Sequence, residues 1–133
     1  MVALGREAIL AAGKLRSEAV EIPEWGGSVI VREMTGTDRD RFESSIISMK
    51  GAKPELRMQG ARALVAALCV VDDAGERIFG DADLAALGGL SGAALTRVFE
   101  VASRLSGMTA ETMEELVEGF PLAASGEIGS GSP

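Results

Sequence analysis

The sequence contains no histidine and no tyrosine, and cysteine occurs once among its 133 residues. Without histidine the commonest general base and metal ligand is missing, and neither a Ser-His nor a Cys-His nucleophile can be built. The single Cys69 excludes an internal disulfide and a multi-cysteine zinc site. It lies on the apolar face of a predicted helix, where a lone thiol is typical of a small core residue. We therefore expect no enzymatic activity, no cofactor and no metal site.

Positive charge is also scarce, because 13 Lys and Arg stand against 20 Asp and Glu, which gives a net charge of −7. The basic residues form no run, so the sequence argues against nucleic acid and anionic membranes as partners. No apolar run approaches the length of about 18 residues that spans a bilayer, and the N-terminus lacks the apolar segment of a signal peptide. We expect a soluble, cytosolic protein whose acidic surface would suit a basic protein partner.

Hydrophobic residues make up 47% of the chain and aromatic residues only 4%, so the core must be built mainly from aliphatic side chains. A chain of this length buries roughly two thirds of its unfolded surface without disulfides. The patterns predict a small, mostly helical α+β single domain with about five helices and one or two short β-hairpins. We place the domain at residues 1–120 and a flexible Gly/Ser-rich tail at 121–133.

The longest dense apolar stretch covers residues 54–79, and the rest of the chain is expected to pack around it. Pro54 suits the first position of a helix. Apolar residues then recur at spacings of three and four, at Met58, Ala61, Leu64, Val65, Leu68 and Cys69. Beyond this helix, the pattern predicts a hairpin with a strand at 70–71, a turn at 72–75 and a return strand at 77–79. Asp72 and Asp73 favour the turn over a calcium loop, because the alternating ligand spacing of an EF-hand is missing.

The remaining elements follow from caps, periodicity and turn residues. A hairpin is expected from strands at 17–22 and 28–34, with Val20 and Ile22 facing Val29 and Val31 across a turn at 23–27. Five further helices are expected. The first covers residues 4–12 and stops at Gly13, and the second begins after an N-cap at Thr37 and turns Phe42, Ile46 and Met49 inward. The other three run from an Asp81 cap to Gly88-Gly89, from a Ser91 cap through Leu105 to Gly107, and from a Thr109 cap to Phe120.

Three segments stand out in the sequence: residues 20–42 (VEIPEWGGSVIVREMTGTDRDRF), 66–79 (AALCVVDDAGERIF) with the Asp81 helix after it, and 94–109 (ALTRVFEVASRLSGMT). Together these segments resemble phage tail assembly chaperones of long-tailed phages. They occur in the family's order over roughly residues 15–118. None of them is a catalytic signature, so the resemblance depends on the three occurring together.

The resemblance implies a non-enzymatic factor of the bacterial host cytoplasm that is absent from the mature virion. Its expected partners are the tape-measure protein, which it would bind, and the tail-tube protein, which it would help to recruit; a homo-oligomer is also possible. In many such phages a ribosomal frameshift near the end of this reading frame adds an extension, and the tail at 121–133 would suit such a junction. The alternative is a structural tail-terminator or connector subunit that remains in the virion.

Trp25 is the only tryptophan, and it falls at the tip of the predicted hairpin. Exposed aromatic residues are common binding anchors, but Trp25 could equally fold back to cover the core. We hypothesise that Trp25, Gly26, Gly27 and Phe42 contribute to the partner-binding surface. For Phe42, a position in the core is a strong alternative.

Overall fold

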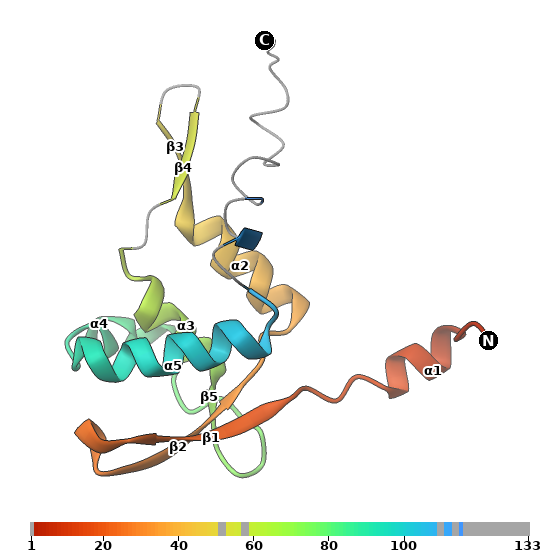
Figure 1. Ribbon diagram of the computed structural model, residues 1–133, viewed down its shortest axis with the longest axis horizontal. Helices are drawn as coiled ribbons and strands as arrows, with labels where there is room; N and C mark the ends of the chain where they lie inside the picture. Colours follow the sequence, from red (N-terminus) through yellow and green to blue (C-terminus); the bar gives the residue numbers. More distant parts are fainter. Residues whose placement is uncertain (1, 51–52, 57–58, 109–110, 113–114, 116–133) are drawn as a thin grey trace.

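Short helices and strands alternate along the chain in the computed structural model, which describes residues 2–50, 53–56, 59–108, 111–112 and 115 (Figure 1). The described elements, in chain order, are α1 (Arg6–Ala11), β1 (Ser17–Ile22), the 3-10 turn η1 (Pro23–Trp25), β2 (Gly27–Arg32), α2 (Gly36–Ile46), β3 (Ile47–Lys50), β4 (Lys53–Leu56), α3 (Ala61–Cys69), β5 (Val70–Val71), the 3-10 turn η2 (Asp81–Asp83), α4 (Leu84–Gly88) and α5 (Gly92–Leu105). The predicted small, mostly helical α+β fold with one or two short hairpins is confirmed, with β1 pairing to β2. The second hairpin, β3 with β4, was not predicted. Of the helix expected from Thr109 to Phe120, only residues 111–112 and 115 are among the described residues. The predicted tail at 121–133 lies outside them.

The first predicted hairpin is present as the antiparallel pair β1–β2, in which Val20 lies opposite Val29. The face that carries these two residues turns toward the helices, and its Ile22 and Val31 are completely buried. α5 packs across this face of the sheet. The alternation of apolar and polar residues therefore predicted the hairpin and its buried side, but the observed register places Ile22 opposite Gly27 and Val31 opposite Glu18.

The central helix is buried on nearly every side, but it is shorter than predicted. α3 begins at Ala61, and all of its residues except Arg62 are buried. Pro54 lies instead in β4, opposite Met49 of β3, so the prediction of a helix from Pro54 is wrong. Gly60, the N-cap of α3, has φ of +78°, a left-handed conformation that glycine adopts readily and that a helix cannot continue through. Met58 lies outside the described residues.

The strand after α3 joins the first hairpin instead of forming its own. Val70 and Val71 of β5 pair with Val31 and Ile30 of β2, which makes a three-stranded sheet of order β1-β2-β5. The predicted return strand at 77–79 is reduced to one bridge between Val71 and Arg77. The apolar β5 is buried by pairing with β2, and the turn at 72–75 forms as predicted.

The helix α2 begins two residues earlier than expected. The Thr35 hydroxyl accepts the Asp38 backbone N–H at 3.0 Å, and the Asp38 carboxylate accepts the Thr35 N–H at 3.4 Å. This capping box makes Thr35, not Thr37, the N-cap. The helix ends at Ile46, so Met49 belongs to β3 and not to the inner face of the helix.

Among the later helices, α5 matches the prediction from its Ser91 cap to Leu105, and Gly107 follows with φ of +73°. α4 is also present, but Asp81 does not cap it. Asp81 forms an ion pair with Arg41 of α2 at 2.9 Å, while Asp83 accepts the Gly80 N–H. α3 packs against α2, α4 and α5, and this packing forms the core.

Candidate functional site

The tip of the first hairpin, which carries Trp25, is a defined turn. The chain turns through η1, the Gly26 N–H donates to the Pro23 carbonyl at 3.1 Å, and Gly26 has φ of +75°. Trp25 is half-buried and packs against the core cluster. Trp25 therefore lies between the two predicted positions, an exposed binding anchor and a ring that covers the core, because it packs against the core and is still partly exposed to solvent.

An ion pair fastens this tip to α5. Arg97 of α5 donates to the Glu24 carboxylate, next to Trp25 in the sequence. The pKa of Glu24 is lowered, first because its carboxylate accepts a hydrogen bond from its own backbone N–H and further by Arg97, against the opposing effect of burial. The tip is therefore held in place by contacts on both sides of Trp25.

Phe42 lies away from the surface that the hypothesis assigned to it. Its side chain has no exposed area, and its ring packs against Phe99 of α5 with centroids 6.2 Å apart. In this conformation Phe42 cannot touch a partner directly. Of the four hypothesised residues, only Trp25, Gly26 and Gly27 lie together at one place, the hairpin tip, and partner binding there stays a prediction.

The side chains with possible chemical roles serve the fold. Cys69 is completely buried, and burial, with a further contribution from Asp38, raises the pKa of its thiol to about 12. A thiol in this state is not a nucleophile at neutral pH. Asp72 accepts hydrogen bonds from the N–H groups of Ala74 and Glu76, as expected for a turn residue. Within the described ranges, no three His, Cys, Asp or Glu residues are grouped to hold a metal ion.

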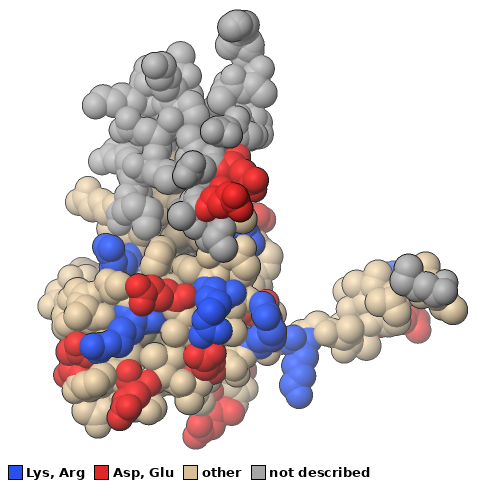
Figure 2. Space-filling model, in the orientation of Figure 1, with Lys and Arg blue, Asp and Glu red and all other residues tan. Residues whose placement is uncertain are grey.

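The surface carries both charges side by side. Figure 2 shows Lys and Arg interspersed with Asp and Glu over the body of the molecule on the face it presents. Several of these charges form ion pairs, including Arg39 with Glu43 and Arg104 with Glu18. Among the described helices, none combines the length and apolar character that a membrane crossing requires.

Arginines that reach across the fold were not predicted from the sequence. Arg32 of β2 donates to the Leu68 carbonyl at 3.0 Å and pairs with Asp38 at 3.1 Å, and Arg77 donates to the Ala67 carbonyl at 2.8 Å. Both arginines bind free carbonyls at the C-terminal end of α3, where the helix dipole favours positive charge. No local spacing signals such contacts, because Arg32 and Leu68 are 36 residues apart.

One comparison with known proteins identifies the family, and a second shows a similar fold. A family model described as phage tail assembly chaperone matches residues 5–116. The solved structure of the bacteriophage HK97 tail assembly chaperone resembles the fold with a TM-score of 0.56 and 20% sequence identity, covering 77% of this chain and 95% of that one. No protein of curated function matches the chain. Since the family model spans nearly all described elements, the chain belongs to the phage tail assembly chaperone family.

Proposed function

We propose that this tail assembly chaperone binds the tape-measure protein of its phage and helps to bring tail-tube subunits onto it, without catalysing a reaction. The observation that carries the proposal is the family match over residues 5–116. The buried and unreactive Cys69 and the absence of histidine agree with a binding role. We place the protein in the cytoplasm of the bacterial host during assembly and outside the finished virion.

The hairpin tip of Trp25, Gly26 and Gly27 is the surface we assign to the tape-measure protein. Trp25 offers a large ring that is already ordered by its contact with the core, so little conformational entropy is lost when a partner covers the rest. The ion pair between Glu24 and Arg97 fixes the turn that presents it. A half-exposed aromatic residue on an ordered turn suits an apolar segment of an extended partner.

Co-expression with the tape-measure protein tests this assignment. The full chain should keep the tape-measure protein soluble and co-elute with it, whereas Trp25→Ala should lose at least tenfold in affinity while remaining folded. Ile78→Ala is the matched control, because Ile78 is another exposed apolar residue, 52% exposed, but lies outside the tip. Equal loss in both variants, or full binding by Trp25→Ala, would place the surface elsewhere.

A separate measurement tests the assembly role. The tail-tube protein should be captured together with the chaperone and tape-measure protein, and mass spectrometry of purified virions should find no copies of this chain. Stoichiometric copies in virions would instead support a structural tail-terminator or connector subunit. If the tape-measure protein stays insoluble and unbound beside a correctly folded chaperone, the proposed function is wrong.

A further inference from the structure

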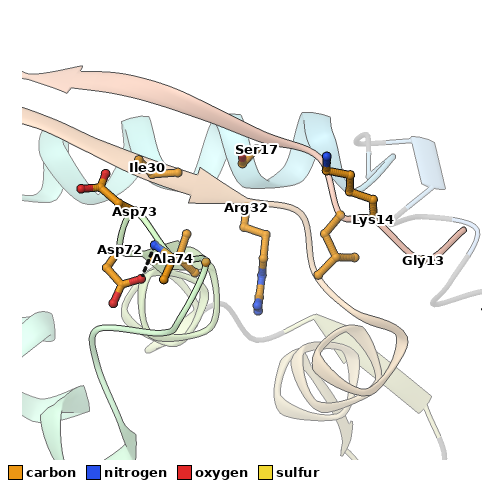
Figure 3. Close-up of a pocket in the computed structure, with 11 residues that line it drawn as sticks. Gly13, Lys14, Ser17, Ile30, Arg32, Asp72, Asp73 and Ala74 are labelled. Atoms are coloured by element: carbon orange, nitrogen blue, oxygen red, sulfur yellow. Dashed lines mark hydrogen bonds between the residues drawn. The ribbon is translucent and has the colours of Figure 1, made fainter. Parts of the chain in front are cut away.

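The two edges of the three-stranded sheet differ in how far they are open. β5 forms a short edge of two residues, and its Val71 is also bridged to Arg77. The turn at 72–75 follows β5 there and lines a hollow together with Ile30 and Arg32 of β2 (Figure 3). β1 forms the other edge, and its six residues pair with β2 without a break. In the described part of the chain, no strand pairs with the outer edge of β1.

The register fixes which backbone groups of β1 face outward. The Glu33 N–H donates to the Arg16 carbonyl at 2.8 Å, and this contact continues the register of β1 and β2 by one pair. In an antiparallel ladder, hydrogen-bonded pairs alternate with pairs whose N–H and carbonyl groups point away from each other. Ser17, Ala19 and Glu21 therefore direct these groups away from β2, and among the described residues none bonds to them.

The outer edge of β1 lacks the features that commonly protect an edge strand. Proline, lysine and β-bulges are frequent at such edges because they prevent a further strand from pairing. β1 contains neither proline nor lysine, and its pairing with β2 shows no bulge. α5 packs over the inner face of the sheet, and every residue of β1 except Val20 and Ile22 is exposed. The edge therefore keeps the geometry that is needed to accept another strand.

The charges along β1 favour a basic partner. Glu18 forms an ion pair with Arg104 at 2.8 Å. Glu24, at the hairpin tip, forms one with Arg97. Glu21 lies between these two carboxylates in the sequence, is exposed, and has no ion pair within the described residues. Because β1 itself carries no positively charged side chain, a Lys or Arg on an incoming strand would be attracted to Glu21.

We propose that β1 binds the tape-measure protein by strand addition, in which an extended segment of that protein pairs with the outer edge of β1. This inference rests on the proposed function and gives it a binding mode. Since β1 leads directly into η1, the same segment would reach Trp25 at the end of the edge. Backbone hydrogen bonds to Ser17, Ala19 and Glu21 would supply affinity. A basic side chain beside Glu21 and an apolar one against Trp25 would select the segment and fix its register.

Ala19→Pro tests the backbone pairing, because proline removes an N–H that the ladder with β2 does not use. In the full chain this variant should remain folded and lose at least tenfold in affinity for the tape-measure protein. Ala19→Val is the matched control, because valine keeps the N–H and favours a strand, and it should bind like the wild type.

Ser28→Pro is a second control for the same substitution. Ser28 lies opposite Glu21 and also directs its N–H away from the β1–β2 ladder, but on the side of β2 that faces away from β1. It should bind the tape-measure protein like the wild type. Full binding by Ala19→Pro, or an equal loss in Ala19→Val or Ser28→Pro, would overturn the proposal.

Glu21→Lys tests the charge that the segment should carry. The reversal should weaken binding about fivefold at low salt and less at high salt. Glu76→Lys is its control, since Glu76 is exposed, forms no ion pair within the described residues and lies after the turn that follows β5. Equal effects of the two reversals would show that no basic side chain faces Glu21.

Residue-resolved hydrogen exchange tests the proposal without any substitution. The N–H groups of Ser17, Ala19 and Glu21 should exchange readily in the free chain and at least tenfold more slowly in the complex with the tape-measure protein, while the N–H of Ser28 should not change. A complex in which the three groups still exchange readily overturns strand addition and leaves the proposed function standing. Failure to form any complex refutes both. Protection that is already present in the free chain also overturns the proposal, because the edge is then occupied without the tape-measure protein.

Discussion

Replacing Phe42 by alanine should unfold the protein more readily rather than remove a contact from its surface. The ring is completely buried, and removing such a ring leaves a cavity and costs about 3–5 kcal/mol. The loss of the contact with Phe99 falls within this range, since an aromatic pair adds about 0.5–1.5 kcal/mol. A domain of this size has a total free energy of unfolding of about 5–15 kcal/mol, so Phe42→Ala removes a large part of it.

Urea denaturation followed by the fluorescence of Trp25 measures this effect, because Trp25 is the only tryptophan and lies against the core. With a urea dependence of about 2 kcal/mol per M, the midpoint should fall by about 2 M. Phe79→Ala is the matched control, because Phe79 is only half-buried and its replacement should lower the free energy of unfolding by about 1–2 kcal/mol. A loss below about 1 kcal/mol for Phe42→Ala, or one no larger than that of Phe79→Ala, would refute the assignment of Phe42 to the core.

Three further predictions concern a cap, a turn and the thiol. Thr35→Ala should lower the free energy of unfolding by about 1 kcal/mol, whereas Thr37→Ala should change it by only a few tenths; equal effects would contradict the observed cap. Gly26→Ala should cost about 1 kcal/mol through its φ of +75° alone, since no atom lies within 4 Å of the added methyl group, and Gly27→Ala should cost less in the same urea assay. Cys69 should resist thiol reagents until the protein unfolds. Because burial raises the pKa of its thiol to about 12, the contribution of the protonated thiol to the free energy of unfolding is complete below pH 9. This contribution is lost as the pH rises toward 12, by up to about 1.4 kcal/mol per pH unit, and Cys69→Ala should lack this pH dependence of stability.

Local patterns in the sequence determined several elements and the family. The amphipathic period of α5, the alternation in β1 and β2 and the turn residues between them are short-range signals, so they predicted both the element and its buried face. Three segments that occur in the family's order resembled phage tail assembly chaperones, and the match of the family model to residues 5–116 then showed that the chain belongs to that family. No motif of the sequence is a catalytic signature, and the chain contains no histidine.

Only the tertiary structure decided where those elements end and what they touch. The sequence pattern predicted one helix from Pro54, but Pro54 falls in a strand and α3 begins only at Ala61, directly after the left-handed Gly60. β5 pairs along its length with β2 and through only one bridge, Val71 to Arg77, with the residues that follow it. Both valines are buried in this arrangement. The burial of Phe42 and the contact of Arg32 with α3 both depend on segments distant in sequence. Such contacts are set by packing in three dimensions, which local spacing does not encode.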